Sequence, residues 1–272
     1  MPCGGHGTRM RAITGGAPKE MLSVRGIPLV EWAARECAAS GITELLVVTA
    51  PGKESIEAHL APLAGTPGMP ARIVFAWQSD ARGLADAVRL GRDFAAGGPL
   101  CVALADNLFV GGPPAVAQTI ETFASARTNV VAVVEIDAED AARRGATGVV
   151  TGTLVGETEF RFARIPDKGE HGATFDTAGA RAAFTNVGRF AFGPELFEVI
   201  DEVERTLAPG AELDDVPVLQ WMLARGRLVG RRIVGRFVDA GLPEGYREAR
   251  ELLESPASGA GRASGGAPPP GS

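Results

Sequence analysis

Two glycines separated by one residue lie near the start of the chain, and two basic side chains follow them. Gly5 and Gly7 permit a tight turn that can approach a ligand closely, because neither residue carries a Cβ atom. Successive backbone N–H groups in such a turn favour phosphate oxygens. Arg9 and Lys19 add a planar and a compact cation, which can neutralise charge as a phosphoryl bond breaks. These residues indicate a polyphosphate site, with an ordinary surface loop as the alternative.

The spacing of the other reactive residues excludes several kinds of site. The turn is not a Walker loop, because no Gly-Lys-Ser/Thr ends it, and the third glycine of a dinucleotide fingerprint is missing. The three histidines have no metal-ligand spacing, and no Gly-x-Ser-x-Gly sequence is present. Neither a zinc metalloprotease site nor the nucleophile turn of a serine hydrolase is therefore expected.

Each of two aspartates follows an apolar stretch that predicts a buried strand. Asp106 follows residues 100–105, and Asp239 follows residues 232–238. Ligands of open α/β sheets gather at the carboxyl ends of strands, so the two carboxylates can meet and hold Mg²⁺ against phosphate oxygens. For Asp106 the alternative is a turn-forming Asp-Asn pair.

Other polar residues are candidates either for ligand contacts or for structural roles. Gln78 and Gly83 bracket a loop after a predicted strand, and a glutamine amide suits the edge of a nucleobase, although a loop glutamine commonly faces solvent. Lys168 lies in a hydrophilic turn and is expected to be exposed. Glu212 and the two aspartates after it can cap the helix that follows.

Composition narrows the class of protein further. The 272 residues are 45% hydrophobic, enough for one large domain or two small ones with a sizeable core. A net charge of −6 without a basic tract argues against general nucleic-acid binding but not against an anionic small ligand. No leader and no apolar run near the length of a membrane span is visible, so neither export nor a membrane is expected.

The cysteines and lysines add two smaller expectations. Cys3, Cys37 and Cys101 are widely spaced, which favours buried thiols in a reducing cytosol over disulfides or a zinc site. Lysine is rare in this arginine-rich chain. Its few positions are therefore a weak indication of sites at which a compact ammonium group has a specific role. Lys53, at the start of a predicted helix, is nevertheless expected at the surface.

Hydrophobic periodicity predicts a doubly wound, mostly parallel Rossmann-like α/β sheet with helices on both faces. In the first half, strands are predicted at 44–49, 71–77, 100–105 and 129–136, with helices at 28–40, 53–60, 83–94 and 113–126. The second half suggests a smaller, partly antiparallel insertion, with strands at 147–153, 159–165, 182–192 and 228–238 and helices at 195–207, 216–225 and 243–253.

The two ends of the chain carry separate expectations. Only three residues precede the glycine turn, so the apolar strand that normally leads into such a turn is expected to be truncated, with the start codon assigned too late. Residues 254–272 contain almost only Gly, Ser, Ala and Pro and are expected to form a disordered tail.

Taken together, the motifs resemble those of the sugar-1-phosphate nucleotidyltransferases, particularly the bacterial UTP–glucose-1-phosphate uridylyltransferases. The shared order is Gly-x-Gly-Thr-Arg, Pro-Lys-Glu-Met-Leu, Gln-x₄-Gly-Leu and a strand that ends in Asp. Further matches are Asn186-Val187-Gly188-Arg189-Phe190, Glu212-Leu213, and Val238-Asp239-Ala240-Gly241 before Gly245-Tyr246. The resemblance covers residues 1–253, which it divides into a nucleotide-binding half (1–136) and a sugar-phosphate-binding half (137–253).

The resemblance implies a role for each matched residue. The nucleoside triphosphate would be bound by Gly4, Gly5, Gly7, Thr8, Arg9, Gln78 and Gly83. The sugar phosphate would be bound by Lys168, Gly188 and Glu212, and catalysis would rest on Arg9, Lys19, Asp106 and Asp239. Asp106 and Asp239 would carry Mg²⁺, and relatives are often homo-oligomers. The implied reaction is in-line attack of a sugar-phosphate oxygen on the α-phosphorus of UTP, with pyrophosphate released.

This chain departs from the family pattern at two internal positions. Arg164-Ile165-Pro166 replaces a Glu-Lys-Pro whose lysine holds the sugar phosphate, so Lys168 or Arg164 substitutes for it or the acceptor differs from glucose 1-phosphate. Asp106-Asn107 replaces a pair of aspartates, as in the related thymidylyltransferases. Two alternatives follow: the same reaction on a modified sugar or cyclitol phosphate, or a non-catalytic homologue that binds nucleotide sugars.

Overall fold

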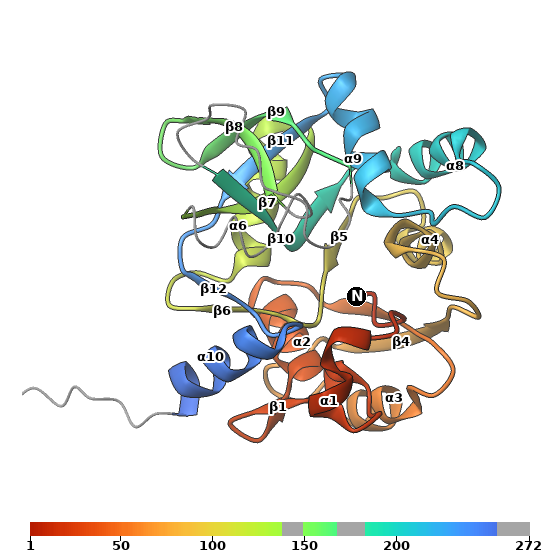
Figure 1. Cartoon of the computed structure of the whole chain (residues 1–272), viewed down its shortest axis with the longest axis vertical. Helices are drawn as coiled ribbons and strands as arrows, with labels where there is room; N and C mark the ends of the chain where they lie inside the picture. The colour runs from red at the N-terminus through yellow and green to blue at the C-terminus, as the bar shows by residue number, and fades with distance from the viewer. Residues whose placement is uncertain (138–148, 168–182, 255–272) are drawn as a thin grey trace, which may run out of the picture.

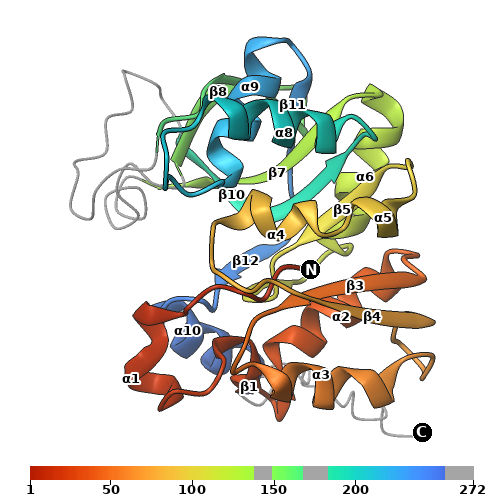
Figure 2. The same ribbon diagram turned by 90° about the vertical axis from the view of Figure 1, so that its right-hand side faces the viewer.

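The computed structural model describes residues 1–137, 149–167 and 183–254, and its largest element is a mixed six-stranded sheet (Figures 1 and 2). In spatial order its strands are β5 (Leu100–Ala103), β10 (Ala183–Phe192), β7 (Asn129–Ile136), β11 (Leu228–Arg232), β9 (Glu159–Arg164) and β8 (Val149–Val155). β7 and β11 are parallel, and the other neighbours are antiparallel. The α/β class with helices on both faces is confirmed, but this sheet is mixed rather than mostly parallel. Each of its antiparallel pairs includes a strand from the second half of the chain, where antiparallel pairing was expected.

Alternate residues of β7 show how the sheet is covered on both faces. Val131 and Val133 pack in the cluster that contains α4 (Leu84–Arg89), α8 (Leu196–Thr206) and α9 (Asp215–Ala224). Ala132, between them, packs on the opposite face with Ala115 of α6 (Ala115–Ala126). Figure 2 shows α6 and the α8–α9 pair on opposite sides of the sheet. This two-sided burial explains the near-continuous apolar run of β7.

A smaller layer holds the start of the chain. The parallel strands β3 (Glu44–Thr49) and β4 (Arg72–Trp77) pack with α2 (Leu29–Ala39) and α3 (Glu54–Leu60). Pro2 forms one parallel bridge to Val48, whose carbonyl accepts from the Cys3 amide at 2.7 Å. Beside this bridge, a cavity of about 370 Å³ lies between β3 and β5 and is lined mostly by apolar side chains.

The segment predicted as one strand at 228–238 forms two strands in different sheets. After β11, the chain turns at Gly235 (φ +127°) and continues as β12 (Arg236–Asp239), which pairs antiparallel with β6 (Asn107–Val110). α10 (Pro243–Glu254) then packs against β12 (Figure 1). The prediction was wrong because the break depends on a partner strand far away in the sequence.

Smaller differences concern short elements. The helix predicted at 83–94 is divided at Gly91 into α4 and α5 (Arg92–Ala95). Around the glycine turn the chain forms η1 (Thr8–Met10), α1 (Arg11–Thr14), η2 (Lys19–Met21) and a hairpin of β1 (Ser23–Val24) and β2 (Ile27–Pro28). A further short helix, η3 (Ala61–Leu63), follows α3. The remaining predicted elements agree with the structure to within a few residues.

Two expectations about the chain as a whole can be compared with the described residues. All three cysteines are free thiols, as expected, and Cys3 and Cys37 are buried. None of the helices in the described part of the chain combines the length and apolarity needed to cross a bilayer. Residues 255–272, most of the predicted tail, lie outside the described residues.

Candidate functional site

The glycine turn lies between the short pairing of Pro2 with β3 and the first helical turn. Gly7 is in the left-handed region (φ +60°), and a Cβ atom there would be 3.5 Å from the Lys19 side chain. A Cβ atom on Gly4 would be only 2.6 Å from Oε1 of Gln78, so a larger residue cannot occupy that position without displacing the amide. Gly5, Thr8 and Arg9 are exposed. The turn therefore contacts Gln78 on one side and Lys19 on the other.

Lys19 forms an ion pair with Asp106, which follows β5. Both side chains are largely shielded, with 23% and 15% of their surfaces exposed. Burial alone would raise the pKa of Asp106, but the charge and hydrogen bond of Lys19, with smaller help from a backbone hydrogen bond and Arg189, hold that pKa below its usual value. Burial likewise opposes the charge on Lys19, yet Asp106 raises the pKa of Lys19 above its usual value. Both groups are therefore charged near neutral pH.

Asp239 is brought to Asp106 by the pairing of β12 with β6. In that register Asp239 lies opposite Asn107, and the Ala240 amide donates to the Asp106 carbonyl at 2.9 Å. Both carboxylates converge on Gly241, where a Cβ atom would be 2.3 Å from Oδ2 of Asp106 and 3.1 Å from Oδ1 of Asp239. A side chain at Gly241 would therefore have to displace the Asp106 carboxylate.

The loop that carries Asp106 is held in place by a buried arginine. Arg189 is fully buried and donates to the carbonyls of Leu104 and Asn107, each at 2.8 Å. Its charge is balanced by Glu36 of α2 at 2.6 Å. The motif match included Arg189 without assigning it a role. All three of its guanidinium nitrogens donate hydrogen bonds, and those to Leu104 and Asn107 position the backbone on both sides of Asp106.

A second buried cation holds the glycine turn against η2. Lys53 is only 8% exposed, so the prediction of a surface lysine was wrong. Its ammonium donates to both carboxylate oxygens of Glu20, at 2.9 Å each, and to the Cys3 carbonyl. Burial raises the pKa of Glu20, and Lys53 opposes that effect. The rarity of lysine in this chain was the one sequence signal that pointed to Lys53.

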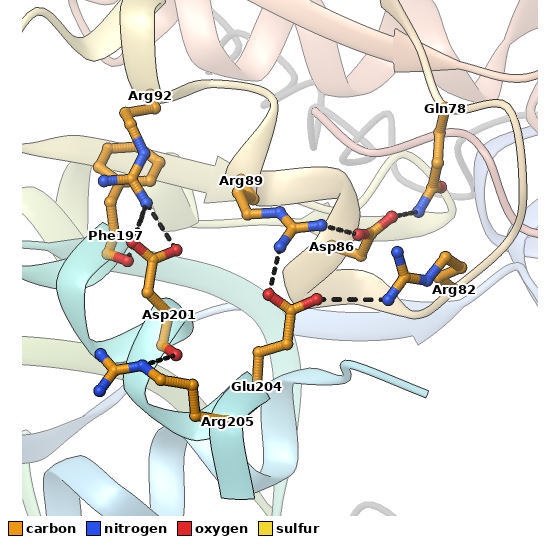
Figure 3. A network of polar contacts seen from close by, with 9 residues as sticks. All are labelled: Gln78, Arg82, Asp86, Arg89, Arg92, Phe197, Asp201, Glu204 and Arg205. Carbon is orange, nitrogen blue, oxygen red and sulfur yellow. Dashed lines mark hydrogen bonds and ion pairs between the residues drawn. The ribbon is translucent and has the colours of Figure 1, made fainter. Parts of the chain in front are cut away.

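Gln78 follows β4 and is buried, so the exposed-loop alternative does not hold. Its Nε2 donates to Oδ2 of Asp86 at 2.7 Å (Figure 3). It also donates to the Gly83 carbonyl at 3.3 Å. Gly83 has φ +115°, and a Cβ atom there would be 2.3 Å from the Leu213 carbonyl. Gly83 therefore holds the loop against the segment before α9, and its carbonyl faces Gln78.

Of the residues expected to bind the sugar phosphate, only Gly188 lies directly beside the carboxylates within the described part of the chain. Gly188 (φ +64°) is buried at a bulge of β10, where a Cβ atom would be 2.3 Å from Nδ2 of Asn107, directly beside Asp106. Glu212 is exposed on the segment that lies along Gly83, and it is Asp214, not Glu212, that caps α9. Lys168 lies outside the described residues.

Ile165 occupies the position at which the resemblance led us to expect a lysine, and its side chain is buried in the main core. Gln220 donates to the Ile165 carbonyl at 2.9 Å, which fixes the backbone there. Arg164, on the neighbouring position, is exposed. No cation can therefore be supplied by position 165 itself.

The carboxylates are suited to a metal ion that takes few protein ligands. Within the described ranges no group of three or more His, Cys, Asp or Glu side chains is arranged to hold a metal alone. Mg²⁺ is bound in phosphate-transfer sites by one or two carboxylates, with water and substrate phosphates as its other ligands. Asp106 and Asp239, converging beside Lys19 and the glycine turn, fit that requirement.

A family model described as "Nucleotidyl transferase" matches residues 3–255. The chain belongs to the nucleotidyl transferase family. It is 28% identical over 268 residues to the UTP–glucose-1-phosphate uridylyltransferase of Pseudomonas aeruginosa, with 91% of this chain and 92% of the relative covered. It is 29% identical over 263 residues to a putative UTP–glucose-1-phosphate uridylyltransferase of Bacillus subtilis, with 90% and 92% covered.

Solved structures agree with the fold of this nucleotidyl transferase. A UDP-glucose pyrophosphorylase complexed with UDP-glucose superposes with a TM-score of 0.76 at 23% identity, covering 93% of this chain and 96% of that chain. The resemblance drawn from the motifs is thus confirmed at the level of the family, the fold and the enzyme class.

Proposed function

We propose that this nucleotidyl transferase moves a uridylyl group from UTP to a sugar 1-phosphate, by default glucose 1-phosphate, and releases pyrophosphate. The observation that carries the proposal is the convergence of Lys19, Asp106 and Asp239 beside a glycine turn. Relatives whose names state this reaction align with at least 90% of the chain, which supports the choice of substrates.

In the proposed reaction a phosphate oxygen of the sugar 1-phosphate attacks the α-phosphorus of the triphosphate. A new P–O bond forms, and the bond from the α-phosphorus to its bridging oxygen breaks, so that the electron pair leaves on pyrophosphate. Lys19 has three N–H donors, and one that remains on Asp106 leaves two for phosphate oxygens. Arg9, exposed on the same turn, can add a planar donor pair to the leaving phosphates.

Asp106 and Asp239 would hold Mg²⁺, which when bound neutralises charge on the phosphate oxygens. The protein contributes mainly alignment, because Arg189 and Lys53 hold the two backbone segments that carry the charged groups. Residues 1–136 would bind the nucleotide and residues 137–253 the sugar phosphate, with Gly188 and Glu212 on the sugar.

A second candidate keeps the reaction and changes the acceptor to a modified sugar or cyclitol phosphate. The burial of Ile165 favours it, because the cation expected at that position is absent. Lys168 or Arg164 would otherwise have to bind the acceptor phosphate. A cytosolic location and self-association also belong to the proposal, and cell fractionation and light scattering test them.

The proposal is tested by pyrophosphate release with Mg²⁺, across four nucleoside triphosphates and a panel of sugar and cyclitol phosphates. We expect release with UTP and glucose 1-phosphate. Release with another acceptor only would select the second candidate. No release across the panel, from folded protein that binds UTP in calorimetry, would refute the transferase activity.

A further inference from the structure

Gln78 has its hydrogen-bond directions fixed by the residues behind it. Its Nε2 donates to the Asp86 carboxylate and to the Gly83 carbonyl, and both of these partners are acceptors. An amide nitrogen has two N–H groups, so both are used inside the protein. Gln78 can therefore offer a ligand only its oxygen.

The oxygen of that amide faces the proposed nucleotide site. Oε1 of Gln78 lies 2.6 Å from the position of a Cβ atom on Gly4, at the start of the glycine turn. Within the described residues no hydrogen-bond donor reaches Oε1. This oxygen is not fully buried, so a ligand can approach it. A group that reaches Oε1 beside the turn must bring an N–H or O–H.

Asp86 holds the Gln78 amide in this orientation, and an ion pair with Arg89 fixes the Asp86 carboxylate in turn. Arg89 donates to Oδ1 of Asp86 at 2.6 Å, while Gln78 donates to Oδ2, so both carboxylate oxygens act as acceptors. Arg89 also donates to Glu204 of α8 at 2.6 Å. Arg82, from the loop that contains Gln78, donates to the other carboxylate oxygen of Glu204 (Figure 3). The amide cannot reverse without placing its oxygen against a carboxylate.

We propose that Asp86 is the positioning residue that makes Gln78 an acceptor and thereby selects a pyrimidine with an N–H at ring position 3. Uracil and thymine carry that N–H, whereas cytosine has a lone pair there and would face Oε1 without a hydrogen. UTP and CTP have nearly the same size, so the discrimination rests on hydrogen-bond polarity rather than on fit. The inference rests on the proposed function, whose substrate choice it explains.

The test compares UTP and CTP in the full-length protein and in Asp86→Asn. Asparagine has the shape of aspartate but can turn its own NH₂ toward Gln78, which allows the Gln78 amide to reverse. We expect wild type to prefer UTP, and the ratio of kcat/KM for UTP to that for CTP to fall about tenfold or more in Asp86→Asn, in line with one hydrogen bond. The fall should come from a weaker reaction with UTP and a stronger one with CTP.

Asp201→Asn is the matched control, because Asp201 lies on α8 and pairs with Arg92 in the same region without contacting Gln78 (Figure 3). We expect its UTP-to-CTP ratio to equal that of wild type. A ratio unchanged in Asp86→Asn, with both substrates weakened equally, would make Asp86 merely structural and overturn the inference.

Calorimetric binding of UTP and CTP to the same three proteins separates this inference from the proposed reaction. If no triphosphate releases pyrophosphate, the reaction is refuted, but the UTP-to-CTP ratio of dissociation constants still tests Asp86. If Asp86→Asn does not fold, Asp86→Ser, which removes the carboxylate and offers a hydroxyl that can donate as well as accept, should lower the same binding ratio. Wild-type binding that favours CTP would refute the assigned polarity of Gln78.

Discussion

The ion pair of Lys53 and Glu20 makes the sharpest prediction about stability. Lys53→Met removes the ammonium and leaves the Glu20 carboxylate, with 3% of its side chain exposed, without the cation that is hydrogen-bonded to it. Breaking a buried pair on one side costs about 3–5 kcal/mol, and we expect about 3 kcal/mol because the Lys53 side chain keeps 11% exposure. With a urea m-value of about 3 kcal/mol/M, the unfolding midpoint should fall by about 1 M.

The size of this defect should depend on pH. Burial raises the pKa of Glu20 in the folded state, and Lys53 is the strongest influence that lowers it, so Lys53→Met should raise that pKa further. A folded-state pKa above the unfolded value stabilises the protein below the unfolded pKa, and this stabilisation is lost as pH rises through the folded pKa. The loss caused by Lys53→Met should therefore be smaller at pH 5 than at pH 8.

Urea unfolding at both pH values, followed by tryptophan fluorescence, measures the effect. Arg72→Met is the control, because Arg72 and Glu44 form an exposed pair with 58% and 53% of their side chains exposed, worth about 1 kcal/mol or less. The double variant Lys53→Met/Glu20→Gln should regain most of the loss. A defect in Lys53→Met as small as that of Arg72→Met, or one that is equal at pH 5 and pH 8, would refute the reasoning.

Three further predictions concern catalysis. Asp239→Ala should abolish pyrophosphate release with little change in the thermal midpoint, and an active variant would rule out the metal assignment. Gly241→Ala would place a Cβ atom 2.3 Å from Oδ2 of Asp106, so turnover should fall at least tenfold while UTP still binds in calorimetry; an unchanged rate would show that the carboxylates are not confined. Lys168→Ala should raise KM for the acceptor phosphate and not for the triphosphate, and equal rises for both would contradict its assigned role.

The charged residues at strand ends were predictable because their position follows from local patterns. Apolar runs that end in Asp106 and Asp239 predict that the two carboxylates meet, and they do converge, although Asp239 ends β12, which pairs with β6 outside the six-stranded sheet. Lys19 was placed with the glycine turn from its type and position, whereas the motif order was needed to assign Gln78 to the same site.

The supporting residues could not be predicted, because their partners are far away in the sequence. Lys53 looks like an exposed helix start until Glu20, 33 residues away, is placed beside it. The break between β11 and β12 likewise depends on Gly235, where a Cβ atom would be 2.4 Å from the Gly111 carbonyl. Apolar residues continue on both sides of that break, so periodicity gives no sign of it.

A single short turn connects the residue proposed to read the base with the carboxylates proposed to hold Mg²⁺. Gly4 contacts Gln78, Gly7 contacts Lys19, and Lys19 pairs with Asp106, which converges with Asp239. A shift of the turn would therefore move the amide oxygen and the ammonium together. Because Lys53 holds the Cys3 carbonyl at the start of this turn, a change that loosens it should weaken base selection and phosphate binding together rather than either one alone.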